Sequence, residues 1–408
     1  VGHADEDNTD AYNLDLSKRR AAHVRDLILQ RDAALRGRVT TSGRGELDPR
    51  APRCNPDLVG HEAAEARLLE AWTSGRMHHA WLITGPRGIG KATLAYRMAR
   101  FVLSGGGEGG GGLFGDGPEN LYLSPENGTF RRVVSGGHPD FAHLEVGMMN
   151  PDSKKIAQND IPVALARKTI EFVRLTPAES DWRVIVVDAA DDLNRNAANA
   201  LLKALEEPPD RALFLLVSHA PGRLLPTIRS RCRQLVLPPL SDKTVVSLLR
   251  ERFPDMEPPE LQALAHLAEG SIGKAAELAE AGGIDLYRGL MKLMAGAERM
   301  DHGLVTAFAD KISRKGQERQ YQAFRELLDW WFKRFLRARA QGKLPVEVVS
   351  GDDAVHEKLN RLGDLALWLE VWEKMTGLLS RTESPANLDK RHVLVSAFSS
   401  LEAALAGR

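Results

Sequence analysis

The sequence is poor in cysteine and in long apolar runs. Only two of its 408 residues are cysteines, Cys54 and Cys232, which is too few for a disulfide framework or for a zinc site built from cysteines. Such scarcity is typical of a reducing compartment, so we expect a cytoplasmic location. No apolar run approaches the roughly 18 residues that a membrane-spanning helix requires, and no membrane partner is expected.

An excess of charge of either sign is also missing. Lys and Arg total 55, Asp and Glu total 55, and the formal net charge is zero. Net charge therefore does not draw the chain toward nucleic acid, and any contact with DNA must be local. The hydrophobic share of 43% and the charged share of 27% are ordinary for a globular protein.

What the sequence does contain is most of a phosphate-binding loop. Residues 85–93 read Gly-Pro-Arg-Gly-Ile-Gly-Lys-Ala-Thr, between an apolar strand and a helix, which is the context that such a loop requires. Glycines let backbone N–H groups face a phosphate, and the lysine reaches the β- and γ-phosphates. Ala92 occupies the position of the hydroxyl that binds Mg²⁺. The predicted nucleotide contacts in this loop are Gly85, Gly88, Gly90, Lys91 and Thr93.

A second nucleotide motif is also incomplete. The apolar run 183–187 ends at Asp188, which is placed to lie beside a metal ion, but Ala189 replaces the second acid. Hydrolysis needs Mg²⁺ held by a hydroxyl and an acid, and a group that orients the attacking water. Ser218, after another apolar run, either senses phosphate or is a structural hydroxyl. We expect little or no intrinsic ATPase activity, and weak or no binding of ATP or ADP with Mg²⁺.

Apolar strands alternate with helices over residues 53–239, which predicts an α/β domain with a parallel sheet. The glycine-rich stretch within residues 104–137 predicts a flexible surface insertion. The strands are expected at residues 80–84, 141–146, 183–187 and 213–217.

From residue 240 onward the sequence is helical. We expect a small helical domain over residues 240–283 and an all-α domain over 284–408, with one long helix near 354–379. Trp368 and Trp372 are four residues apart and share a helical face. These rings either pack in the core or are shared with a neighbouring subunit.

Residues 1–52 differ from the rest of the chain. Their motifs resemble part of the peptidoglycan-binding domain of the outer-membrane protein A family, in which residues at the positions of Asp5 and Arg20 grip diaminopimelate. About half of such a domain is represented, so we expect a remnant or a fusion. A peptidoglycan-binding envelope protein is a minor alternative for the function.

The order of the remaining motifs resembles the bacterial clamp-loader family of AAA+ proteins. The phosphate loop and the Asp188 motif precede Ala-Asn-Ala-Leu-Leu-Lys-Ala-Leu-Glu-Glu-Pro-Pro at residues 198–209 and Ser-Arg-Cys at 230–232. The degenerate Walker motifs resemble those of delta-prime subunits within this family. The resemblance covers about residues 53–408.

The resemblance implies a non-motor subunit of the DNA polymerase III holoenzyme that helps load the sliding clamp on primed DNA. It implies motor (gamma/tau) and delta subunits as partners, with the clamp and primed DNA reached through the complex. Arg231 is then an arginine finger for the ATP of a neighbouring motor subunit. Residues 240–283 correspond to a lid, and 284–408 to a collar that holds subunits together. The chain would belong to a nucleotidyltransferase holoenzyme whether or not it is an enzyme itself.

Two departures from the family pattern affect these expectations. Many relatives carry four zinc cysteines after the phosphate loop, but this chain has none there, so zinc is not expected. Gly273 replaces the sensor-2 arginine of active motors. An ATP-hydrolysing motor subunit is the alternative, and Ala92, Ala189 and Gly273 each argue against it.

Overall fold

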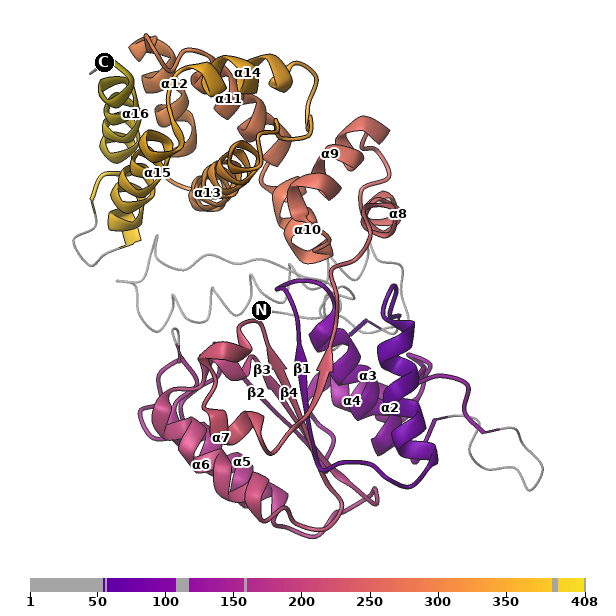
Figure 1. Ribbon diagram of the computed structural model, residues 1–408. Coiled ribbons are helices and arrows are strands. Elements are labelled where there is room, and N and C mark those ends of the chain that lie inside the picture. The colour runs from indigo at the N-terminus through magenta and orange to yellow at the C-terminus, as the bar shows by residue number, and fades with distance from the viewer. Residues whose placement is uncertain (1–53, 56, 108–116, 158–159, 384–387, 407–408) are drawn as a thin grey trace, which may run out of the picture. The chain divides into compact units, whose positions relative to one another are not determined.

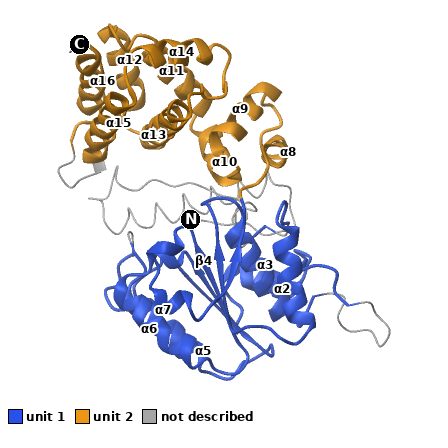
Figure 2. Cartoon of the chain, viewed as in Figure 1, with its two compact units in different colours: residues 1–238 blue, residues 239–408 orange. Residues whose placement is uncertain are grey.

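The computed structural model describes residues 54–55, 57–107, 117–157, 160–383 and 388–406. The chain divides into two compact units, residues 1–238 and residues 239–408 (Figure 2). The segment that resembles part of an outer-membrane protein A domain, residues 1–52, lies outside the described residues.

A parallel sheet with the strand order β2-β3-β4-β1-β5 forms the centre of the first unit. The four strands predicted from the sequence are present, with ends that differ by at most one residue. A fifth strand, β5, was not predicted because only Leu235 of its four residues is buried, so it lacks an apolar run. It lies at an edge of the sheet and pairs with β1. The strands are β1 (Ala80–Thr84), β2 (Phe141–Glu145), β3 (Arg183–Asp188), β4 (Ala212–Ser218) and β5 (Arg233–Val236).

Helices cover both faces of this sheet (Figure 1). Alternate residues of a strand point to opposite faces, and accordingly Trp81 and Ile83 pack in one hydrophobic cluster while Ala80 and Leu82 pack in the other. Every residue of β1 and β4 is buried, which explains why these strands read as continuous apolar runs. The first cluster includes residues of α2 (Glu62–Thr73), α3 (Lys91–Leu103) and α4 (Gly128–Ser135). The second includes residues of α5 (Val163–Val173), α6 (Arg195–Glu206) and α7 (Pro226–Arg229).

The prediction of a flexible insertion over residues 104–137 is wrong for its second half. Residues 128–135 form α4, whose Asn127 side chain accepts a hydrogen bond from the Thr129 N–H at 2.8 Å and thereby caps the helix. Phe130 and Val133 of α4 are buried. The prediction of flexibility rested on the glycine tract, although the residues after that tract include a helix cap and an apolar helical face. Residues 108–116 lie outside the described part of the chain.

The second unit consists of helices that share one hydrophobic core. Its predicted long helix near 354–379 is in fact two, because Asp364 caps a new helix by accepting a hydrogen bond from the Leu367 N–H at 2.9 Å. Residues on both sides of residue 283 contribute to the same core, and the separate lid and collar stay predictions. The described helices are α8 (Asp242–Arg252), α9 (Pro258–Ala268), α10 (Ile272–Glu280), α11 (Gly283–Ala295), α12 (His302–Ile312), α13 (Glu318–Ala340), α14 (Asp352–Arg361), α15 (Leu365–Ser380) and α16 (Lys390–Ala406).

The two tryptophans of α15 have different surroundings. Trp368 is 0% exposed and packs in the core, with its ring 5.2 Å from that of Phe335. Trp372 lies at the margin of the core, and its Nε1–H donates to Asp329 Oδ1 at 3.0 Å. The core interpretation thus holds fully for Trp368 and in part for Trp372. Among the described helices, none is long and apolar enough to span a membrane.

Candidate functional site

The residues of the two nucleotide motifs meet at the carboxyl ends of the parallel strands. The loop of residues 85–90 follows β1, Asp188 ends β3 and Ser218 ends β4. The strands are parallel, and Thr84 pairs with Ser218 while Asp188 pairs with Val217. The sequence motifs are therefore brought together at the carboxyl ends of the strands, where α/β folds commonly bind ligands.

The phosphate loop has the backbone conformation that its glycines permit. Gly85, Gly88 and Gly90 have φ values of 146°, 77° and 106°, a region that residues with a Cβ rarely adopt. A Cβ at Gly85 would lie 2.3 Å from the carbonyl oxygen of Leu237. Glycine at this position therefore permits the turn and also lets the loop pass close to the segment after β5.

Lys91 is folded back onto its own loop. Its Nζ donates to the carbonyl oxygen of Gly85 at 2.8 Å and also to that of Pro86. The side chain is almost completely buried, and burial lowers the pKa of Lys91 to about 8 against the raising effect of Asp188 and Asp191. The amine that would bind phosphate oxygens is occupied by two loop carbonyls.

His61 supports the loop from outside the motif. Its Nε2–H donates to the carbonyl oxygen of Ile89 at 2.6 Å, and a Cβ at Gly90 would lie 3.5 Å from its ring. Burial is the main cause that lowers the pKa of His61, so the ring is neutral at pH 7 and keeps this tautomer. His61 could not be predicted from the sequence, because a lone histidine before a helix carries no recognisable signal.

The acidic side of the site is also engaged internally. The Ser218 hydroxyl donates to Asp191 Oδ1 at 2.9 Å, and the Ala220 N–H donates to the same oxygen at 3.2 Å. Asp191, which the sequence analysis did not single out, thus holds the end of β4 in place. Burial, as the largest cause, raises the pKa of Asp188 to about 6, although Lys91 acts in the opposite direction.

These residues do not fit a magnesium-dependent hydrolytic centre. Ala92 and Ala189 supply neither a hydroxyl nor a carboxylate, and the Ser218 hydroxyl is already bound to Asp191. Thr93 lies within α3 and is 8% exposed. The glycine loop keeps the geometry of a phosphate cradle, but the groups that hold Mg²⁺ and orient water in phosphoryl transfer are replaced or engaged.

Arg231 lies in the turn between α7 and β5. Its Nη2 is 2.7 Å from Glu206 Oε1 at the end of α6, and its Nη1 donates to the Thr227 carbonyl oxygen at 2.9 Å. The side chain is 33% exposed. The next two residues pack against the rest of the first unit: Cys232 is 8% exposed, and the Arg233 guanidinium lies over the Trp81 ring at 4.9 Å. Burial raises the pKa of Cys232 to about 12, so it is not a reactive thiol.

The register of β5 places Arg231 near the amino-terminal ends of the strands, whereas the phosphate loop lies at their carboxyl ends. Arg233 pairs with Trp81, near the start of β1, whereas the loop begins after Thr84. At about 3.3 Å per residue, the four steps from Trp81 to Gly85 span about 13 Å along the strand. Arg231 precedes Arg233 and so lies farther still from the loop of its own chain.

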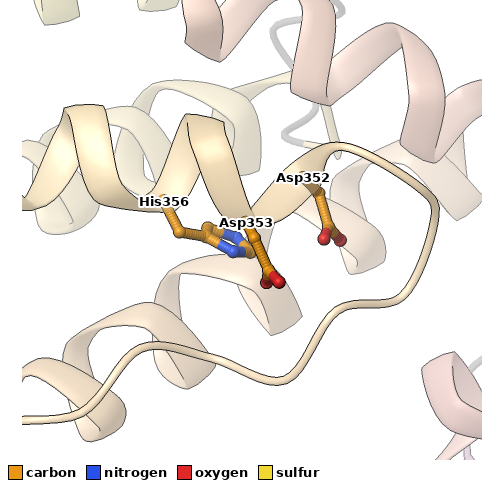
Figure 3. A group of neighbouring side chains, drawn as sticks. All are labelled: Asp352, Asp353 and His356. Atoms are coloured by element: carbon orange, nitrogen blue, oxygen red, sulfur yellow. The ribbon is translucent and has the colours of Figure 1, made fainter.

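A cluster in the second unit has the composition of a metal site but not its chemistry. Oxygen and nitrogen atoms of Asp352, Asp353 and His356 lie within 4.8 Å of one another (Figure 3). The Trp331 Nε1–H donates to His356 Nε2 at 3.0 Å, so a neutral ring carries its proton on Nδ1 and offers no free lone pair. Asp352 Oδ2 accepts hydrogen bonds from Tyr287 Oη and the Val348 N–H, both at 3.0 Å. This network joins α11, α13 and α14, and we interpret it as structural.

Comparison with known proteins relates the first unit to replication proteins. Residues 60–241 match the family described as "DNA polymerase III, delta subunit". DNA polymerase III subunit delta' of Pseudomonas aeruginosa is 35% identical over 193 residues, which cover 47% of this chain and 53% of that protein. The Escherichia coli subunit delta' is 34% identical over 213 residues, covering 52% of this chain and 58% of that protein. The chain thus spans between half and three-fifths of the length of these two relatives.

Two further comparisons are more distant. Subunit tau of Escherichia coli is 30% identical over 235 residues, covering 56% of this chain and 33% of that protein. The solved structure of a DNA polymerase III gamma subunit-related protein from Thermotoga maritima has a TM-score of 0.35 and 16% identity, with 83% of this chain and 99% of that chain covered. A TM-score this low supports no conclusion. The family match begins at residue 60 and does not extend to the segment 1–52. Over residues 60–241 the chain is therefore similar in sequence to DNA polymerase III delta' subunits.

Proposed function

We propose that this chain is a non-motor subunit of the bacterial clamp loader and supplies Arg231 to the ATP site of a neighbouring motor subunit. The observation that carries this proposal is the position of Arg231 near the amino-terminal ends of the strands, away from the phosphate loop of its own chain at their carboxyl ends. From there it cannot serve a nucleotide on its own chain. A guanidinium suits a finger because its fixed charge and planar fork stabilise phosphoryl charge in the transition state.

The chain's own nucleotide site has a passive role in this proposal. Lys91 is bonded to loop carbonyls and Ser218 to Asp191, so ATP or ADP would have to displace internal hydrogen bonds to bind. Binding of nucleotide at this site is therefore weak, and hydrolysis there is negligible. The same contacts argue against the motor-subunit alternative.

The partners follow from the relatives named delta', tau and gamma. They are the motor (gamma/tau) and delta subunits, with the sliding clamp and primed DNA reached through the assembled complex. The chain then acts as a rigid element of the loader in the cytoplasm, and its main chemical contribution is one arginine.

The test is ATP hydrolysis by a loader reconstituted from motor and delta subunits with this full chain, the clamp and primed DNA. The wild-type chain alone should show no turnover, and its addition should strongly stimulate the ring. Arg231→Ala should lower the rate at the affected site by about 10³-fold, and the overall rate by less because other sites keep their own arginines. Arg229→Ala is the matched control, because Arg229 is a nearby arginine that ends α7, two residues before Arg231.

Co-elution of the variant with the other subunits would establish that the ring still assembles. A rate and clamp loading equal to wild type with Arg231→Ala would refute the finger assignment. Turnover by the isolated chain would restore the motor-subunit alternative.

A further inference from the structure

The last residue of α6 contacts Arg231, the residue that the proposed function directs to the ATP of a neighbouring subunit. Glu206 ends this helix, and its Oε1 lies 2.7 Å from Arg231 Nη2. Arg231 itself belongs to a different segment, the turn after α7. The contact therefore joins two elements that the chain brings together by folding.

The end of α6 is fixed in place independently of Arg231. The carbonyl oxygen of Leu205 is 3.1 Å from His79 Nε2, immediately before β1. Leu201, Ala204 and Leu205 of α6 are buried in the cluster on this face of the sheet. Glu206 thus projects from a helix whose end is packed on the sheet, and its backbone position is fixed.

We propose that Glu206 is a positioning residue that holds the Arg231 guanidinium in the orientation required by the neighbour's nucleotide. The inference rests on the proposed function of Arg231. An arginine side chain has several freely rotating bonds, and ordering it at the moment of reaction costs rotamer entropy. Holding it beforehand lowers this cost, in the way that positioning residues generally accelerate reactions.

The geometry leaves donors for the neighbour's nucleotide. A guanidinium carries five N–H groups. Nη1 donates to the Thr227 carbonyl oxygen at 2.9 Å and to Ser230 Oγ at 3.4 Å, and Nη2 forms an ion pair with Glu206 at 2.7 Å. Within the described part of the chain the Nε–H of Arg231 makes no hydrogen bond, so it stays available to the nucleotide. Contacts with Thr227 of α7 and with Glu206 of α6 fix the plane of the guanidinium, while its Nε–H remains open to phosphoryl oxygens.

The adjacent residue provides a matched control. Glu207 has the same side chain, is exposed, and makes no ion pair within the described part of the chain. Any effect that requires only negative charge near the Pro-Pro end of α6 should appear with both residues. An effect through Arg231 should appear with Glu206 alone.

The test uses the reconstituted loader with the full chain, and compares Glu206→Ala, Glu206→Gln, Glu207→Ala, Arg231→Ala and the double variant Glu206→Ala/Arg231→Ala. Glu206→Ala should lower kcat by about tenfold at the affected site with KM for ATP nearly unchanged. Glu206→Gln keeps an acceptor oxygen and should recover most of this loss. Glu207→Ala should behave as wild type. The double variant should be no slower than Arg231→Ala, because Glu206 acts through that residue.

Thermal unfolding and co-elution with the ring establish that each variant is folded and assembled. A wild-type kcat for Glu206→Ala alongside an impaired Arg231→Ala would overturn the inference and leave the proposed function intact. A faster rate for Glu206→Ala would overturn it as well, because the carboxylate would then restrain the finger. A double variant with a lower kcat than Arg231→Ala would also overturn the inference, because Glu206 would then act independently of Arg231. An unimpaired Arg231→Ala would instead refute the proposed function, and the role of Glu206 with it.

Discussion

At the scale of single residues, the degenerate site holds an acid and an amine whose charges are both opposed by burial. Asp188 ends β3 and Lys91 begins α3. Each raises the stability of the other's charged form, yet desolvation is the larger effect for both. In active nucleotide sites such charges are balanced by metal and phosphate. Here the protein balances Lys91 with loop carbonyls, and Asp188 retains a net penalty for ionising.

This penalty predicts a pH dependence of stability. Burial raises the pKa of Asp188 from 3.8 to about 6, so the folded state holds this proton more tightly than the unfolded state. The resulting stabilisation is complete below about pH 4 and is lost as the pH rises through 6. Asp188→Asn should therefore stabilise the free chain at pH 7 and have little effect at pH 4. Urea unfolding at both pH values measures the difference, and an equal effect at both would contradict this account.

At the scale of elements, α6 runs from the Asp188 motif to the contact with Arg231. It begins just after the Asp188 motif and ends at Glu206. Its N-terminus is fixed by Asn194, whose Oδ1 accepts from the Ala197 N–H at 2.9 Å and whose Nδ2 donates to Asp160 at 3.1 Å. A helix of 12 residues rises about 18 Å.

Removal of the cap should therefore destabilise α6 without removing any group that contacts Arg231. Asn194→Ala should lower the free energy of unfolding by about 1 kcal/mol. Asn194→Ser keeps an acceptor for the Ala197 N–H without adding a charge beside Asp160, and should cost much less. Urea unfolding of the free chain compares the two variants, and an equal loss for both would show that the cap is not the source of the effect.

At the scale of the whole molecule, the hydrophobic clusters respect the division into two units. The clusters on the two faces of the sheet contain residues up to 237, and the cluster of the helical unit begins at Leu240. Each unit therefore has its own core, which is the usual basis for separate cooperative unfolding.

A core truncation in one unit should accordingly loosen that unit selectively. Phe214 in β4 is 1% exposed, and Phe214→Ala should cost about 3–5 kcal/mol within residues 54–238. Hydrogen exchange should accelerate in β1, β3 and β4 while the amides of α13 keep their wild-type protection. Phe332→Ala, at a residue that is 0% exposed in α13, should give the reverse pattern. Equal acceleration in both units after either substitution would indicate a single cooperative body.

The sequence allowed the sheet to be predicted well, because doubly covered strands such as β1 and β4 are continuous apolar runs. It also placed the phosphate loop, since glycine spacing is a local signal. It did not reveal β5, an edge strand with one buried side chain. Nor did it reveal the partners of the site residues. The contacts of Arg231 with Glu206 and of Ser218 with Asp191 span 25 and 27 positions and depend on how strands and helices assemble.

The two buried cysteines have a practical consequence for spectroscopy. Cys54 and Cys232 are both buried, and Cys232 resists ionisation, so a thiol-directed nitroxide reacts poorly with the native chain. Cysteines introduced at Arg223 and Lys343, which are exposed in the first and second unit, can therefore be spin-labelled without removing the native pair. Dipolar coupling between two such labels would report the distance between the units, first in the free chain and then in the assembled ring.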